Sequence, residues 1–216
     1  MSFSKTFSKG EAVRFGWKIA KENIAFWIVV VMIAIVFDKS GAMIEKLLDI
    51  PEKSFTSFGI SFIQLLISIF MYVGMIRISL QFYDQKQPQV RDLFSGGDVF
   101  LKAIVGEILY ILMILCGLIL LIVPGIIWSL QYQFVIYLIA DRGMGPFEAF
   151  KESSRLSKGV KGNLFVFWLI LLGIVLLGAL ALLVGLLWAI PTVYLAHAFV
   201  YRKLVEQSSG EVSLLK

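Results

Sequence analysis

The longest apolar stretch of the chain runs from Leu164 to Val200, and His197 is its only side chain that can be charged near neutral pH. A transmembrane helix needs roughly 20 apolar residues, so this stretch is long enough for two crossings joined by a tight reversal. A water-soluble domain of this size has too little interior to bury that much apolar surface. The pattern predicts an integral membrane protein.

Four further apolar stretches precede this one, so we expect six transmembrane helices arranged as three hairpins in an all-α fold. The expected crossings are Ile24–Phe37, Phe58–Leu80, Val99–Val123, Ile126–Ala140 and two within Leu164–Val200, with the last reversal near Gly185–Ala189. Three parts of the chain follow from this pattern, namely an N-terminal segment 1–23, a transmembrane domain 24–203 and a tail 204–216.

The basic residues favour one orientation of these crossings. Of the 20 lysines and arginines, 17 fall before the first crossing, after even-numbered crossings or in the tail, counting Arg77 and Lys102 at the ends of the second and third crossings. The opposite side has only Lys39, Lys46 and Lys53, beside four acidic residues. Basic loops stay on the cytoplasmic side, so we expect both termini to be cytoplasmic in a bacterial inner membrane. The first apolar run has the shape of a signal peptide, but it lacks a small-x-small cleavage site, and we expect it to be retained.

The composition agrees with a membrane protein and gives little reason to expect a nucleic-acid partner. The chain is 59% hydrophobic and 16% charged, with a mean hydropathy of +0.87. Soluble domains are about 45–50% apolar and about 25% charged. The net charge of +5 follows from the cytoplasmic loops, so it is poor support for nucleic-acid binding. The single Cys116 lies in an apolar stretch and is expected to pack there.

Two parts of the chain align at an offset of sixty residues, with possible repeat units 85–142 and 145–202. Gly-Ile-Ile-Trp at 125–128 matches Gly-Leu-Leu-Trp at 185–188, and Arg142 aligns with Arg202. Glycine permits a sharp reversal, and tryptophan prefers the membrane interface. The expected hairpin-reversal residues are Pro124, Gly125, Trp128, Gly185, Trp188 and Pro191. The competing interpretation is that aliphatic runs align by chance.

Short amphipathic helices are expected on the cytoplasmic side before the hairpins. Ser8 and Glu11 have the spacing of a capping box, and Pro146 suits a first helical position. The second of these helices leads into a group of interfacial basic residues, Lys151, Arg155, Lys158 and Lys161. These residues either bind anionic membrane lipids or only hold the loops inside the cell.

The chain resembles a family of bacterial multi-pass membrane proteins related to the membrane domain of some glycerophosphodiester phosphodiesterases. The residues that carry the resemblance are Leu-Ile-Val-Pro-Gly-Ile-Ile at 121–127, Asp-Arg-Gly-Met-Gly-Pro at 141–146 and the polar stretch 148–159, within a similar region of residues 85–205. The resemblance implies a six-helix membrane domain. It does not imply phosphodiesterase activity, because that reaction belongs to a separate soluble domain.

Polar side chains within the apolar stretches form a candidate site. At similar depth near the cytoplasmic ends lie Arg77, Glu107 and His197, with Gln131 and Gln133 deeper in the fourth crossing. Ionisable groups in lipid are costly, and they often mark a functional site. A Glu107–Arg77 or Glu107–His197 pair would neutralise the carboxylate. The cluster is either a polar vestibule or a structural network between helices.

Enzyme motifs are absent from the sequence. It has no Walker loop, nucleophile elbow or dinucleotide-binding fingerprint, and one histidine with one cysteine gives no metal-binding spacing. We therefore expect no enzymatic activity, cofactor or metal. The small residues Gly173, Gly178, Ala181 and Gly185 would let another helix approach the fifth crossing, within the chain or from another membrane protein.

Two functions fit this pattern. The first is a non-enzymatic scaffold or accessory subunit of a membrane complex, because few polar residues lie along the crossings. The second is a transporter or flippase-like conduit for a lipid or other amphipathic substrate, based on the repeated hairpins and the polar cluster. The sequence leaves the substrate, the partner and the oligomeric state open.

Overall fold

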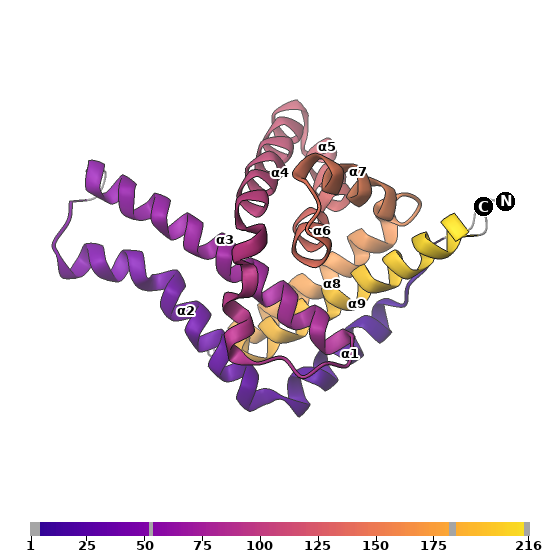
Figure 1. Ribbon diagram of the computed structural model, residues 1–216, viewed down its shortest axis with the longest axis horizontal. Coiled ribbons are helices and arrows are strands. Elements are labelled where there is room, and N and C mark those ends of the chain that lie inside the picture. The colour runs from indigo at the N-terminus through magenta and orange to yellow at the C-terminus, as the bar shows by residue number, and fades with distance from the viewer. Residues whose placement is uncertain (1–4, 52–53, 182–184, 214–216) are drawn as a thin grey trace.

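A computed structural model of the 216-residue chain describes residues 5–51, 54–181 and 185–213 (Figure 1). Within these ranges every regular element is helical. In chain order the elements are α1 (Lys9–Glu22), α2 (Ile24–Leu47), α3 (Phe55–Tyr83), the 3-10 helix η1 (Val90–Val99), α4 (Phe100–Leu120), α5 (Ile122–Tyr132), α6 (Val135–Arg142), α7 (Pro146–Ser157), α8 (Lys161–Leu180) and α9 (Leu186–Ser213). The expected all-α fold is confirmed.

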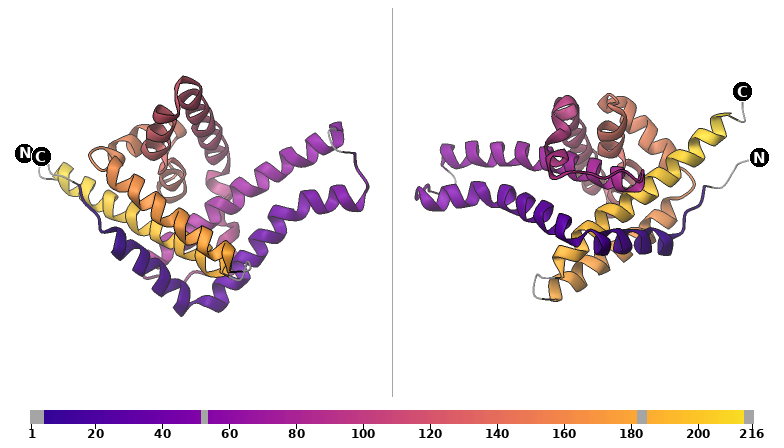
Figure 2. Two further views of the ribbon diagram at one scale, coloured as in Figure 1. Left: turned by 180° about the vertical axis from the view of Figure 1, so that it is seen from behind. Right: turned by 60° about the horizontal axis from the view of Figure 1, so that its bottom comes forward.

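Three helix pairs form hairpins that diverge from a shared centre. In Figure 1 the α2/α3 pair points to the left, α4 and α5 reverse at the top, and α8 and α9 meet at the lower centre. The two views in Figure 2 show the same separation. The hairpins therefore do not lie side by side as one parallel bundle.

Five helical stretches in the described ranges are long and apolar enough to cross a membrane: Ile24–Leu47, Phe55–Tyr83, Val90–Leu120, Ile122–Arg142 and Lys161–Leu180. The chain thus has the helices of a membrane protein. The sixth expected crossing falls in α9, which is not among the five and contains His197, Arg202 and Lys203. Six crossings in three hairpins stay a prediction.

The first apolar helix is longer than the sequence suggested. We expected a crossing that ended at Phe37, but α2 continues through Asp38 to Leu47. Gln64 of α3 supports this continuation, because its Nε2 donates to the Phe37 carbonyl at 2.8 Å and its Oε1 accepts from the Gly41 N–H at 3.0 Å. A polar side chain on the neighbouring helix thus bonds α2 where its apolar pattern ends.

Glycine contacts close the α4/α5 and α8/α9 hairpins in the same way. A Cβ on Gly117 would meet the Gly125 Cα at 2.8 Å, and a Cβ on Gly178 would meet the Gly185 carbonyl oxygen at 3.0 Å. Only glycine permits such an approach. Gly125 and Gly185 occupy matching positions of the two proposed repeat units, whereas Gly178 lies one residue beyond the position that matches Gly117.

The structure shifts the expected reversal residues by a few positions. The first reversal is at Leu121, which has extended backbone between α4 and α5, and Pro124 lies inside the first turn of α5. Proline is tolerated there because first-turn N–H groups have no helical partner. Trp188, Ala189 and Pro191 lie in α9, and residues 182–184 of the second reversal are outside the described ranges.

The amphipathic helix α1 runs alongside α9. Ser8 caps it as expected, because the Ser8 Oγ accepts from the Glu11 N–H at 3.2 Å. At one end the Thr6 N–H donates to the Gln207 Oε1 at 3.0 Å, and at the other the rings of Trp17 and Trp188 are 5.6 Å apart. The two helices therefore pack antiparallel along most of α1 (Figure 2).

An ion-pair network joins the ends of α3 and α6 to the middle of α9. The Arg202 guanidinium donates to Asp141 at 2.8 Å and to Asp84 at 2.7 Å, and the Tyr201 hydroxyl also donates to Asp141 at 2.8 Å. The Arg202 side chain is 18% exposed. This network ties together helices that belong to three different hairpins.

Candidate functional site

Three of the five residues in the expected polar cluster line one cavity. Glu107 of α4, Gln133 at the end of α5 and His197 of α9 surround a volume of about 170 Å³, together with Tyr72 of α3. These residues come from four helices, and each is partly exposed. Three members of the predicted cluster are therefore close together, although the sequence did not identify the hydrogen-bond partner of each residue.

Arg77 lies elsewhere. Its guanidinium donates to both carboxylate oxygens of Asp98, at 2.7 and 2.8 Å, and its Nε donates to the Ala140 carbonyl at 3.0 Å. It also bonds the Ser95 carbonyl. The suggested Glu107–Arg77 pair is not formed. Helix η1, the next element after α3, places Asp98 beside the Arg77 guanidinium instead.

Gln131 also points away from the cavity. Its amide nitrogen donates to the Ser154 hydroxyl at 2.8 Å, and its amide oxygen accepts from the Lys161 ammonium. Of the interfacial basic residues, Lys161 is thus the one that contacts the fourth apolar stretch.

The span Ile122–Arg142 is a broken helix at this point. Helix α5 ends at Tyr132 and α6 begins at Val135. The Ser153 hydroxyl of α7 donates to the Gln131 carbonyl at 2.9 Å and accepts from the Phe134 N–H at 3.2 Å. The sequence does not predict this role of Ser153, because the break has no proline or glycine to mark it.

The charge state of the cavity depends on Glu107. The His197 Nε2 is 3.0 Å from the Gln133 Oε1, and the Gln133 amide nitrogen donates to the Leu130 carbonyl at 2.8 Å. Glu107 makes no hydrogen bond or ion pair with the residues that the structure describes. The suggested Glu107–His197 pair is therefore not formed, and the carboxylate faces the cavity without a counter-ion.

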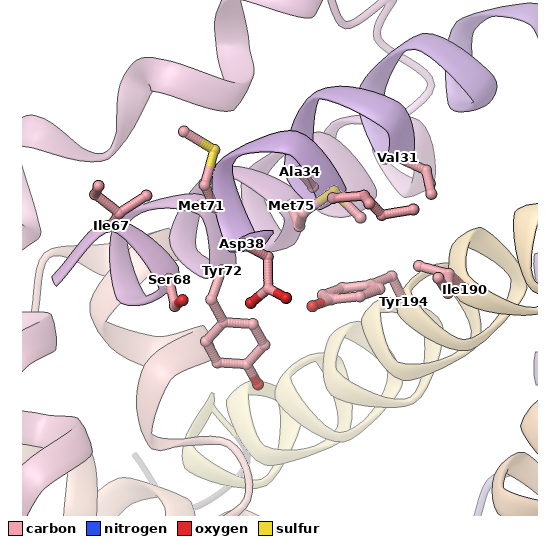
Figure 3. A pocket seen from close by; sticks show the side chains of 11 residues that line it. Val31, Ala34, Asp38, Ile67, Ser68, Met71, Tyr72, Met75, Ile190 and Tyr194 are labelled. Atoms are coloured by element: carbon pink, nitrogen blue, oxygen red, sulfur yellow. The ribbon is translucent and has the colours of Figure 1, made fainter. Parts of the chain in front are cut away.

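A second cavity of about 300 Å³ lies between α2, α3 and α9. Asp38 points into it, toward the rings of Tyr72 and Tyr194 (Figure 3). Tyr72 lines both cavities. Sequence reasoning placed Asp38 in an outer loop. Its spacing after Val31 and Ile35, seven and three residues, could have shown that these side chains share one helix face.

The remaining interfacial basic residues lie on and beside α7, away from the cluster. Lys151, Arg155 and Lys158 line an open depression of about 470 Å³. Arg155 donates to both oxygens of Glu152, at 2.6 and 2.8 Å, and this bonding lowers the pKa of the Glu152 carboxyl.

Across the described ranges no group of three histidine, cysteine or acidic side chains could hold a metal ion.

Comparisons with known proteins relate the chain to uncharacterised bacterial proteins. Two similar proteins are an uncharacterised protein of Mycobacterium bovis and one of Mycobacterium tuberculosis, each 26% identical over 97% of this chain and 71% of the relative. No solved structure matches, and nothing in the comparisons links the chain to the membrane domain of glycerophosphodiester phosphodiesterases. Residues 23–208 match the family described as "Protein of unknown function (DUF975)", and the chain belongs to that family.

Proposed function

We propose that the protein is a non-enzymatic conduit that lets the polar part of an amphipathic substrate, such as a lipid headgroup, enter the bilayer. The observation that carries this proposal is the pair of cavities that share Tyr72. Each cavity has one carboxylate, Asp38 in the first and Glu107 in the second. A scaffold has no need of two adjoining cavities that each hold a carboxyl group between apolar helices, where each polar side chain costs free energy.

The broken helix supports the same function. Irregular backbone at membrane depth is tolerated where it is buried in protein or lines a polar cavity, and transporters often build binding sites from interrupted helices. Here Leu130 and Gln133 beside the break line the smaller cavity. With both termini in the bacterial cytoplasm, as the basic residues favour, this cavity lies toward the inner leaflet.

A lipid-exchange assay tests the proposal. Vesicles of phosphatidylethanolamine and phosphatidylglycerol would carry an acyl-labelled fluorescent lipid, and dithionite would quench only the outer leaflet. We expect the protein to make inner-leaflet label accessible, and Gln133→Leu to slow this exchange. The matched control is Gln87→Leu, at an exposed position between α3 and η1. Exchange no faster than in protein-free vesicles would refute the conduit.

The scaffold remains the second candidate because the hairpins diverge. In each of the five apolar stretches at most 44% of the most apolar segment is buried within the chain. Helices of another protein could occupy the spaces between hairpins. Purification in mild detergent followed by mass spectrometry would favour the scaffold if a stoichiometric membrane protein copurifies, and the conduit if only lipid does.

A further inference from the structure

The cavity beside Glu107 has one acidic side chain and no basic side chain to balance it when it is ionised. No lysine or arginine is among its described lining residues. Lys102, five residues before Glu107, donates to the Gly143 carbonyl, while Arg77 pairs with Asp98 and Lys161 bonds Gln131. A carboxylate in an apolar region is costly unless a cation compensates it. The cavity therefore favours a positively charged guest.

Aromatic side chains form much of the remaining wall. They belong to four different helices: Tyr72, Tyr110, Tyr132 and Trp168. The face of an aromatic ring attracts a cation, and aromatic walls are the usual means by which proteins recognise substituted ammonium groups. A metal ion would instead need several oxygen ligands close together, and this cavity has only one carboxylate.

The size of the cavity fits a small organic group. Its volume of about 170 Å³ corresponds to about five or six water molecules at about 30 Å³ each. Ethanolamine and the trimethylammonium part of choline are of this order, whereas an acyl chain or a sugar headgroup is larger. The acidic side chain, the aromatic wall and the volume of the cavity all favour a small organic cation as the ligand.

We propose that this cavity binds an organic ammonium group, with Glu107 as its counter-ion and the aromatic side chains as its walls. The proposal rests on the conduit function and names its substrate class. The ammonium group belongs either to the headgroup of a lipid or to a free amine, and both sources present the same chemistry to the cavity.

Calorimetry on the full-length protein in detergent tests the charge requirement. The probes are choline and 3,3-dimethylbutan-1-ol, which has nearly the same shape without the charge. We expect choline to bind at least about tenfold more tightly, as a desolvated cation–π site with a counter-ion requires. Equal affinities, or no binding of choline, would overturn the proposal.

Variants of the wall separate binding from folding. Glu107→Gln should weaken choline binding about tenfold or more, whereas Glu148→Gln, an exposed change of the same kind on α7, should not. Tyr110→Leu should weaken it about 3- to 30-fold, whereas Tyr110→Phe retains the ring and should retain binding. Choline binding unchanged by Glu107→Gln, with the melting temperature also unchanged, would refute the role of the carboxylate.

Lipid exchange distinguishes the two sources and separates this proposal from the conduit itself. If a lipid supplies the ammonium group, labelled phosphatidylethanolamine should exchange faster than labelled phosphatidylglycerol, and Glu107→Gln should abolish the difference. If a free amine supplies it, choline should bind while the two lipids exchange alike. Exchange of both lipids without any choline binding would keep the conduit and reject the ammonium site.

Discussion

At the scale of single residues, Arg202 connects three helices that are distant in the sequence. Its guanidinium bonds Asp84 and Asp141, which end α3 and α6. Arg202→Ala leaves two carboxylates near each other, with only the Arg142 guanidinium, 3.8 Å from Asp141, as a described cation beside them. We expect it to lower the free energy of unfolding by about 2–4 kcal/mol, slightly below the range for fully buried pairs because the site is partly exposed. Thermal unfolding in detergent measures this change.

The neighbouring residue provides the control for Arg202. Lys203 pairs with Glu206 at 3.2 Å, with the two side chains 40% and 52% exposed. Lys203→Ala should change stability by less than about 1 kcal/mol. Similar decreases in the free energy of unfolding for the two variants would show that the central network stabilises the fold no more than an exposed ion pair.

A pH dependence belongs to this scale as well. Bonding to Arg155 lowers the pKa of Glu152 from its usual 4.5. A carboxyl with a lowered pKa in the folded state adds stability above its unfolded pKa, and this gain is lost as the pH falls through the folded value. The wild type should therefore melt at a higher temperature than Glu152→Gln at pH 7. The difference should vanish at a pH well below 4.5, and a difference that persists there would contradict the assignment.

At the scale of elements, α7 holds the broken span Ile122–Arg142 in place. The Ser153 side chain is fully buried and bonds both sides of the break. Ser153→Ala would leave a buried N–H and a carbonyl without this partner, at a cost of about 1–3 kcal/mol. We expect faster hydrogen exchange at the Phe134 amide. Ser154→Ala, which loses only a bond to the Gln131 side chain, should leave that amide protected.

The elements also show what an apolar pattern can predict. Apolar runs located the long helices, because lipid and helix packing both select uninterrupted apolar residues. They did not locate the end of α2, since Gln64 of another helix bonds its backbone beyond Phe37. Nor did they reveal the break after Tyr132, whose free backbone groups are bonded by α7. Both features depend on contacts between elements far apart in sequence.

The candidate site illustrates the same limit. Depth along the crossings grouped Glu107 and His197 with Arg77 and placed Gln133 deeper, whereas in the structure Glu107, Gln133 and His197 line one cavity. The depth of a residue in the membrane does not specify which helices are neighbours, so the sequence did not predict the pairing of Arg77 with Asp98. Asp38 was missed because its charge ended the apolar run, although its spacing matches the face of α2 that lines the second cavity.

At the scale of the whole molecule, α1 limits how α8 and α9 can enter the membrane. Helix α1 carries Lys9, Arg14 and Lys18 and accompanies α9 from Gln207 to Trp188. If α9 crossed the bilayer, these charges would be carried toward its centre, at about 2.5–3.5 kcal/mol each. We therefore expect the α8/α9 hairpin to enter from the cytoplasmic face and return to it.

Topology reporters distinguish this arrangement from six crossings. Four crossings and six crossings both place the two termini in the cytoplasm, and five crossings would separate them. A reporter inserted between Ala181 and Gly185 should remain cytoplasmic, whereas one at position 50, in the loop after α2, should appear outside. An external signal from the first insertion would establish the sixth crossing and require α1 to separate from α9 in the membrane. Helix α1 can separate from α9 only if the contacts of Thr6 and Trp17 with α9 are lost. The same insertion therefore also tests whether α1 and α9 remain packed together in lipid.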